Sequence, residues 1–457
     1  MDSATDSLLW GKRKMIDLGR IIRTGLALSA AWLTLQATAQ NASDATLQLL
    51  TYKIKAGDTL HKIASAYLID GVNIERVAQI NQIKDLDLIL AGAELQLPKA
   101  FVKFAPTSAT VMSLSCAGAI LLDHSVALKL GQKVIEGAVI DVPPECHISL
   151  VIEDGSVIRL PSSASVKLVS LKKNLLQTAP EVKLELVKGR VELEVHKGRG
   201  KYTPFEVQTP ISIMGVRGTE FRVGYSDQEQ TGQVEVLEGG VQAQGTSDTQ
   251  SQLVAMGYGA PISREGRILA IEKLLEAPTL DIASTVEGSQ NTYLIRLKPL
   301  DNASYYLADS SPNANAFGER NPEHMLAPEF LTAGLSPQAV FYQFKAVSPN
   351  ALMGKQSHYA FCATEKDSDK CSALFDTPLA NGAPISFVLQ KQVQGQQTDV
   401  INVNNLLARK GRFSIQGLLP GKYNWVLTYT AKSAQDLANG LTQVTQVGEF
   451  ELIRILP

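Results

Sequence analysis

The sequence lacks the residue patterns that usually mark an enzyme or a nucleic-acid-binding protein. Its six histidines are dispersed, and it contains neither a His-Glu-x-x-His nor a Gly-x-Ser-x-Gly motif. Its 43 basic and 45 acidic residues nearly balance, which argues against a large electrostatic surface for nucleic acid. We therefore predict no catalytic residues, no cofactor, no metal site and no nucleic-acid partner.

Cysteine is scarce, with four residues in 457, and none has the spacing to histidine that a zinc site needs. Cys362 and Cys371 flank a polar loop, and in an oxidising compartment a bridge between them would add about 2–3 kcal/mol. Cys116 and Cys146 are candidates for a second bridge. Because four cysteines can pair in several ways, the sequence leaves the connectivity open.

The chain also lacks an apolar run of the length that a membrane-spanning helix needs, about 20 residues. The run at 25–35 is much shorter; it follows a basic stretch and precedes Ala37-Thr38-Ala39. The basic residues are Lys12, Arg13, Lys14, Arg20 and Arg23. This order is typical of a secretory signal peptide, which we assign to residues 1–39, leaving no membrane span after cleavage. An uncleaved membrane anchor is the alternative.

Residues 52–98 carry a succession of short periodic patterns. Tyr52 and Ile54 alternate with lysines as in a strand with one buried face, and Gly57 ends that strand. Asp58 or Thr59 can then cap a helix. The apolar face of that helix would consist of Leu60, Ile63, Ala64 and Tyr67. A second helix around residues 74–78 and an alternating strand at 94–97 complete the order strand, helix, helix, strand, with the strands paired.

This stretch resembles a LysM module, which we place at residues 48–99. The resemblance implies a shallow groove for the N-acetylglucosamine of peptidoglycan, between the loop at 57–60 and the loop at 88–92. The candidate glycan-binding residues are Gly57, Asp58, Thr59, Leu60, Ile89, Ala91 and Gly92. The sequence departs from the family pattern at His61, where an aromatic residue is common, and at Ala91, where proline is common. Two alternatives are an ordinary helical hairpin and a LysM fold that no longer binds sugar.

Short alternating strands follow from about residue 111 to residue 262. Asp154-Gly155 separates two apolar segments and indicates a hairpin turn. Apolar residues also alternate on both sides of Lys188-Gly189, which predicts a second, half-buried hairpin. In that hairpin Glu192 and Glu194 would lie on the outer face, where solvent explains them.

The ordered motifs of this segment resemble a FecR domain, a periplasmic all-β module, which we place at residues 110–263. They include an Asp-Gly-Ser turn, a Pro-Phe-x-Val-x-Thr strand and a Gly-Thr-x-Phe-x-Val strand, and Gly218-Thr219 is expected to bend the chain into a core strand. The best-known FecR proteins carry a cytoplasmic anti-sigma segment. Because a signal peptide and a LysM module stand in its place here, we do not transfer that role to this chain.

The last third of the chain contains aromatic, strand-like segments separated by polar loops and turns. We interpret them as two immunoglobulin-like or fibronectin-type-III-like β-sandwich repeats, at 275–355 and 356–457. The predicted fold class is thus a mostly β, multidomain protein. It would comprise a small βααβ LysM module, an all-β FecR domain and the two repeats.

Together these patterns favour a non-catalytic protein exported to the periplasm or cell envelope of a Gram-negative bacterium. It would bind peptidoglycan through LysM and present its FecR and Ig-like modules to a protein or glycan partner. The alternative is an envelope signalling component whose FecR domain relays a stimulus to a membrane partner. A glycan hydrolase would need two carboxylates held across a cleft, and no motif in the sequence indicates such a pair.

Overall fold

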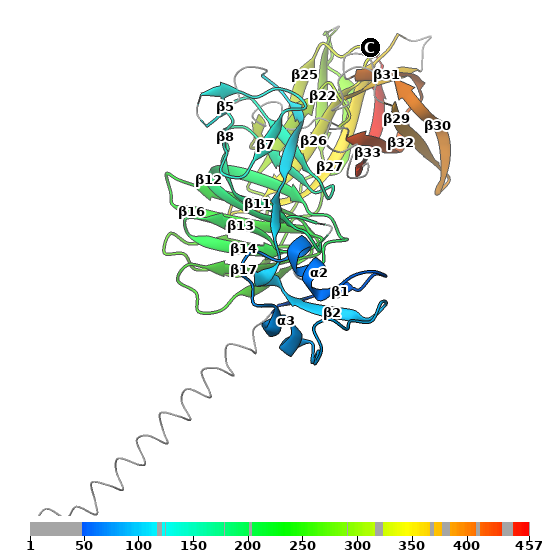
Figure 1. Ribbon diagram of the computed structural model, residues 1–457. Helices are drawn as coiled ribbons and strands as arrows, with labels where there is room; N and C mark the ends of the chain where they lie inside the picture. The colour runs from blue at the N-terminus through cyan, green and yellow to red at the C-terminus, as the bar shows by residue number, and fades with distance from the viewer. Residues whose placement is uncertain are drawn as a thin grey trace, which may run out of the picture. The chain divides into compact units, whose positions relative to one another are not determined.

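The computed structural model describes residues 48–456, except 117–120, 124, 178, 201–202, 290, 316–322, 366–369, 377–383, 408–411 and 432–441 (Figure 1). The predicted signal peptide at 1–39 lies outside the described residues. Of the described residues, 58% lie in strands, and the chain divides into two compact units, Met1–Lys103 and Phe104–Pro457. Among the described residues, no helix is long and apolar enough to cross a membrane.

The first unit has the predicted order of strand, helix, helix and strand. Its elements are β1 (Leu49–Lys53), α2 (Leu60–Tyr67), α3 (Ile74–Ile80), β2 (Glu94–Pro98) and a 3₁₀ turn, η1 (Lys99–Phe101). The strands pair antiparallel, with Tyr52 opposite Leu95. Thr59 caps α2, because its hydroxyl accepts a hydrogen bond from the backbone N–H of Lys62 at 3.2 Å. The βααβ arrangement is therefore confirmed.

The second unit begins with a barrel built from two sheets. The first sheet contains β3 (Phe104–Pro106), β5 (Leu121–Leu122), β6 (Val126–Ala127), β8 (Val139–Asp141), β11 (Ser165–Asn174), β13 (Phe205–Thr209), β14 (Ser212–Val216), β17 (Gly240–Gly245) and β18 (Gln252–Ala255). The second contains β4 (Ser108–Leu114), β7 (Lys133–Ile135), β9 (Ile148–Ile152), β10 (Val157–Leu160), β15 (Glu220–Ser226), β16 (Thr231–Glu238), β19 (Tyr258–Ile262) and β20 (Glu272–Lys273). The long strand β12 (Glu181–Glu194) pairs in both sheets and links them into one closed barrel.

The predicted hairpin at Lys188-Gly189 is wrong, because both of its arms belong to the single strand β12. The arm before Gly189 pairs with β11, and the arm after it pairs with β10 and β15. Gly189 has a φ of +83°, and a Cβ there would lie 2.8 Å from the Cα of Ala164. This kink shifts the alternation from even to odd positions, so Leu184 and Leu193 are both buried in the barrel core.

Other glycines mark the points where the chain crosses from one sheet to the other. Gly218 (φ +60°) lies between β14 and β15, Gly239 (φ +80°) between β16 and β17, and Gly257 (φ +81°) between β18 and β19. In each case the strand before the glycine and the strand after it belong to different sheets. The expected bend at Gly218 into a core strand is confirmed, since Phe221 on β15 is fully buried.

The C-terminal region, from residue 280 onward, contains three further sheets. An eight-stranded sheet has the order β24 (Glu323–Met325), β23 (Tyr305–Ser311), β26 (Val340–Val347), β27 (Met353–Ala363), β33 (Thr442–Ile455), β32 (Gly421–Ala431), β29 (Pro384–Val393) and β30 (Gln396–Leu407). The others join β21 (Leu280–Thr285), β22 (Thr292–Leu297) and β25 (Glu329–Ala333), and β28 (Cys371–Asp376) with β31 (Arg412–Leu418). Two apolar cores result, one around Phe344 and one around Phe387. The eight-stranded sheet draws strands from both proposed repeats, and β27 itself spans position 355.

The outer face of the barrel's second sheet packs against this C-terminal region. Met112, Val151 and Val157 of the barrel belong to the same buried cluster as Phe341 and Phe387. Strand β9 is consequently buried at all five positions, because one face lines the barrel core and the other is covered. The barrel and the C-terminal region therefore share a buried interface, which we call the joint.

Candidate functional site

The two loops of the predicted glycan groove lie side by side in the first unit. The backbone N–H of Gly92 donates to the carbonyl oxygen of Ile54 at 2.8 Å, and the N–H of Ile54 donates to that of Ala93 at 2.9 Å. These bonds extend the pairing of β1 and β2 to the points where the strands end. The loop at 57–60 and the loop at 88–92 therefore leave the sheet from neighbouring positions.

Asp58 holds the first loop closed. Its carboxylate accepts hydrogen bonds from the Tyr52 hydroxyl at 2.9 Å and from the backbone N–H of Lys55 at 2.7 Å. The Lys55 N–H is the main cause that lowers the pKa of Asp58, and the Tyr52 hydroxyl adds to it. Burial, together with the bond to Asp58, raises the pKa of Tyr52. Asp58 thus shapes the loop. Gly57 has a φ of +85° and is exposed, and its carbonyl oxygen accepts a hydrogen bond from the Lys62 ammonium at 3.0 Å.

The second loop presents apolar side chains to solvent. Leu88 is 67% exposed and Leu90 is 71% exposed, whereas Ile89 between them is half-buried. Ala91 and Gly92 are also exposed, and Gly92 has a φ of +88°. The glycan-binding residues predicted from the sequence did not include Leu88 and Leu90. Exposed leucines in this loop are nevertheless suited to contact the methyl of an N-acetyl group.

The remaining two candidates have structural roles visible in the fold. Leu60 is 2% exposed and lies in the core beneath α2, so its side chain is not available to a ligand. Thr59 is exposed but its hydroxyl caps the same helix. Of the predicted glycan-binding positions, Gly57, Ala91 and Gly92 are thus exposed, and Leu88 and Leu90 are exposed beside them.

The four cysteines pair as Cys116 with Cys146 and Cys362 with Cys371. The Cα atoms are 5.7 Å apart in the first pair and 6.3 Å apart in the second, distances typical of disulfides. Among the described residues, no group of three or more histidine, cysteine or carboxylate side chains could hold a metal ion.

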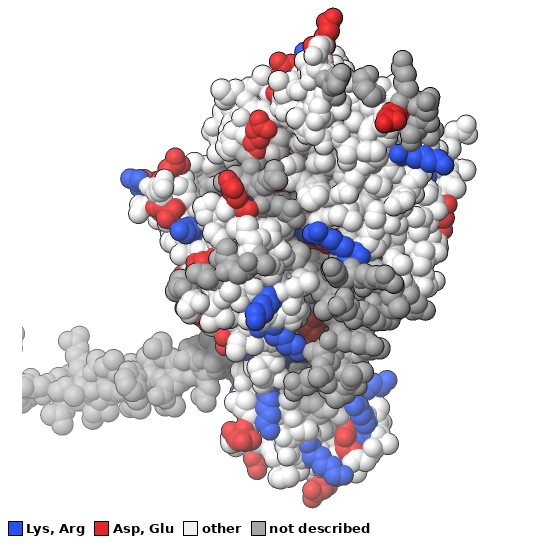
Figure 2. Space-filling view, turned by 90° about the horizontal axis from the view of Figure 1, so that it is seen from above, with Lys and Arg blue, Asp and Glu red and all other residues white. Residues whose placement is uncertain are grey.

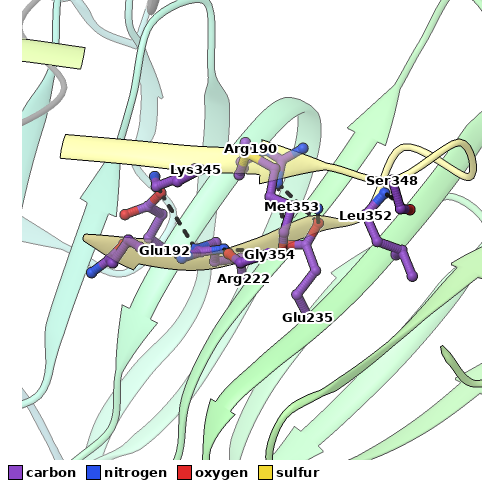
Figure 3. Close-up of polar contacts among 10 residues, drawn as sticks. Arg190, Glu192, Arg222, Glu235, Lys345, Ser348, Leu352, Met353 and Gly354 are labelled. Atoms are coloured by element: carbon purple, nitrogen blue, oxygen red, sulfur yellow. Dashed lines mark hydrogen bonds and ion pairs between the residues drawn. The ribbon is translucent and has the colours of Figure 1, made fainter. Parts of the chain in front are cut away.

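A second concentration of polar groups lies at the joint between the barrel and the C-terminal region (Figure 3). The ammonium of Lys345 on β26 lies 3.0 Å from the carboxylate of Glu192 on β12, and Arg222 Nε lies 3.8 Å from the same oxygen. Arg222, which is 1% exposed, also donates to the carbonyl oxygen of Gly354 at 3.0 Å. The fully buried Glu235 accepts from the backbone N–H of Met353 at 3.1 Å.

The prediction that Glu192 is solvated on an outer face is therefore wrong. The outer face of β12 carries Glu192 as expected, but the C-terminal region covers that face. Burial alone would raise the pKa of Glu192; Lys345 and Arg222 outweigh it and lower the pKa to about 2. Elsewhere the charges are interspersed, and Figure 2 shows no large patch of one sign on the visible face of the described residues.

Comparison with known families identifies two parts of the chain. A family model described as the LysM domain matches residues 52–98, and one described as the FecR protein matches residues 138–242. The chain therefore contains a LysM domain and a FecR domain. Both are non-catalytic domain families. The FecR match lies within the barrel, and the LysM match covers both loops of the groove.

No curated protein matches the chain. Among solved structures, a candidate anti-sigma factor from Parabacteroides distasonis is similar, with 20% identity and a TM-score of 0.25; the match covers 30% of this chain and 59% of that one. The FN1–FN3 domains of chicken CNTN1 show 11% identity and a TM-score of 0.13, over 57% of this chain and 98% of that one. TM-scores this low do not establish a shared overall fold.

Proposed function

We propose that this is a non-catalytic, exported cell-envelope protein that binds peptidoglycan through its LysM domain. One observation carries the proposal: the loop of Gly57 and the loop of Gly92 adjoin each other, with Leu88 and Leu90 exposed beside them. The exposed backbone at Gly57 and Ala91 suits the amide of an N-acetyl group, and the exposed leucines suit its methyl. The residues that would contact the glycan are Gly57, Leu88, Ile89, Leu90, Ala91 and Gly92; Asp58 would act by shaping the loop and Thr59 by capping the helix.

The FecR domain and the C-terminal region would then serve as a scaffold held at the wall. Support comes from the joint between them, which is both apolar and ionic and so fixes one to the other. A rigid β scaffold of this kind can present a surface to a protein or glycan partner without itself carrying out chemistry.

Retention on purified, protein-free peptidoglycan tests this proposal. The wild-type protein is compared with a variant that lacks residues 48–98, at equal concentration and ionic strength. We expect the wild type to sediment with the wall material and the variant to stay in solution. Equal retention of the two proteins would remove the basis for LysM anchoring.

A second candidate function is that of an envelope signalling component, favoured by the match to the FecR family over residues 138–242. In this reading the barrel relays a stimulus to a membrane partner. Transcript profiles of cells with and without the gene separate the two functions: a defined set of genes that changes on deletion supports signalling, and an unchanged profile argues against it.

A further inference from the structure

Strand β30 forms an open edge of the eight-stranded sheet. It is the last strand in the sheet order, and Figure 1 shows it at the outer end, beyond β29 and β32. Within the described part of the chain, β30 pairs with β29 alone. Alternate backbone N–H and C=O groups of residues 396–403 therefore point away from the sheet, and among the described residues they bond to no other strand. Such an edge is a template for a further strand.

This edge is long and accessible. Strand β30 has 12 residues, whereas the end strands β24, β25 and β21 of the neighbouring sheet edges have three, five and six. Residues 396–400 are all exposed, and Val400 is 45% exposed. The backbone groups at this edge are thus within reach of another chain.

The sequence of β30 lacks most of the features that protect edge strands. Natural edges are commonly guarded by lysine, by proline or by other charged side chains. Residues 396–407 contain no lysine, arginine, proline or glycine, and their one charged residue is Asp399. The Asp399 carboxylate accepts hydrogen bonds from the side-chain amides of Gln390 at 2.8 Å and Asn402 at 3.2 Å. Its charge is therefore stabilised within the edge and does little to repel a second strand.

Bulges limit where a further strand can pair. Residues 399 and 401 of β30 pair with consecutive residues of β29, so Val400 is an extra residue, and a second register shift follows Val403. A bulge interrupts the ladder and twists the edge locally. The regular run at 396–399, next to the turn between β29 and β30, is thus the part best suited to pairing.

That run is complementary to a second copy of itself. In an antiparallel pair about a two-fold axis at Thr398, this residue lies opposite Thr398 of the second copy, and Gln397 lies opposite Asp399. Opposed threonines and an amide next to a carboxylate are favourable cross-strand neighbours, and no like charges meet. The Asp399 carboxylate can accept the additional bond, because its two oxygens together offer about four acceptor positions. An unrelated strand would satisfy the backbone alone, whereas self-pairing also satisfies the side chains.

We propose that β30 is a self-association edge, at which two copies of this chain pair antiparallel around residues 396–400. The two eight-stranded sheets then join into one, and both copies use the same surface, as in most two-fold dimers. A contact this short belongs to the small interfaces, below about 1,200 Å², which form weak complexes. The dimer should therefore depend on concentration.

Sedimentation equilibrium of the purified protein from about 1 to 500 µM tests the proposal. We expect the mean mass to rise from that of one chain toward that of two. The variant Thr398→Lys places two ammonium groups opposite each other and should weaken the dimer by about fivefold or more. The control is Thr428→Lys on β32, a strand that is paired on both sides by β29 and β33; it should dimerise as the wild type does.

Two results would overturn the proposal. One is a protein that stays monomeric up to about 500 µM. The other is a dimer that Thr428→Lys weakens as much as Thr398→Lys does, since this would place the contact on the open face of the sheet and not at its edge.

A mixture of variants controls for an effect of Thr398→Lys on folding, because Thr398 pairs with Lys391 of β29. Thr398→Lys and Thr398→Glu at equal concentrations place opposite charges across the two-fold axis. We expect them to form a heterodimer at least about fivefold tighter than the dimer of Thr398→Lys alone. A mixture that associates no more than Thr398→Lys alone would show that the copies do not pair through β30.

Discussion

Lys345 and Glu192 meet 3.0 Å apart although 153 positions separate them in the chain. Lys345 lies on β26 of the C-terminal region and Glu192 on β12 of the barrel. Lys345 is 8% exposed and the Glu192 side chain 24%, so the pair is largely shielded from water and its charges depend on each other. This contact fastens the barrel to the C-terminal region, and several consequences can be measured (Figure 3).

The variant Glu192→Gln should destabilise the second unit strongly. It leaves Lys345 and Arg222 buried without their carboxylate, and breaking a buried pair from one side costs about 3–5 kcal/mol. Urea unfolding gives the free energy, with fluorescence of Trp425 as the signal because it is the single tryptophan after residue 39. The control is Glu194→Gln, whose partner Arg159 is 38% exposed; it should cost at most about 1 kcal/mol. An equal loss of unfolding free energy in the two variants would contradict a larger contribution from the buried pair at the joint.

Stability should fall in acid in two successive windows. The pKa values of buried His147 and His358 are about 4, lowered mainly by burial from 6.5, so the unfolded chain takes up protons first as the pH falls. Stability is then lost between pH 6.5 and 4, by up to about 1.4 kcal/mol per pH unit for each histidine. Glu192, whose pKa is lowered from 4.5 to about 2, stabilises the fold above pH 4.5 and loses this effect as the pH falls toward 2.

Two variants assign these windows. His147→Gln should flatten the dependence of unfolding free energy on pH between 6.5 and 4, and Glu192→Gln should flatten it below 4.5. Unfolding titrations at closely spaced pH values provide the measurement. A profile for His147→Gln parallel to that of the wild type would show that this histidine is not buried in its neutral form.

Gly189→Ala should destabilise the barrel by about 3 kcal/mol, because it combines left-handed backbone strain with overpacking. Its new Cβ would meet the Cα of Ala164 at 2.8 Å. Gly137 in the same barrel has a similar φ of +90° but nothing within 4 Å, so Gly137→Ala should show the strain alone, about 1 kcal/mol. The difference between the urea midpoints of the two variants measures the destabilisation caused by the close approach of residue 189 to Ala164. Equal midpoints would argue against a continuous, kinked β12.

The β12 kink also shows where sequence patterns stop being informative. Lys188-Gly189 between two alternating segments predicts a hairpin, and a strand that changes sheets at a glycine has the same local pattern. What differs is the partner of each arm: β11 on one side and β15 on the other. Those pairings are long-range, so the local alternation correctly predicted which residues are buried but not which strands they join.

The disulfide that closes the longer loop should stabilise the second unit more, because the entropy lost by the unfolded chain grows with the logarithm of loop length. Replacing Cys362 and Cys371, which are 9 positions apart, by alanine should cost about 2–3 kcal/mol. Replacing Cys116 and Cys146, 30 positions apart, should cost more, about 3–4 kcal/mol. Urea unfolding of the two double variants, with the oxidised wild-type protein as reference, checks this order. A larger effect for the shorter loop would contradict it.

The fold of the LysM domain could be predicted from the sequence because its determinants are local. Gly57 and Gly92 end paired strands, and Thr59 caps the helix between them, all within a short segment. The joint was not accessible, since nothing near Glu192 in the sequence indicates Lys345. The sequence did contain one indication of this interface. Val151 and Val157 place apolar side chains on the outer face of the second sheet, and an apolar outer face indicates that another element covers it.

The most direct test of the central claim is equilibrium binding to purified peptidoglycan by the variant Leu88→Asp/Leu90→Asp. Both side chains are more than half exposed, so the fold should persist while the apolar contact with the sugar is lost. Ile69→Asp, at a 46% exposed position of the same domain outside both loops, is the matched control. We expect the double variant to bind at least about tenfold more weakly than the wild type, and Ile69→Asp to bind as the wild type does. Equal binding by all three proteins would contradict glycan recognition by this groove.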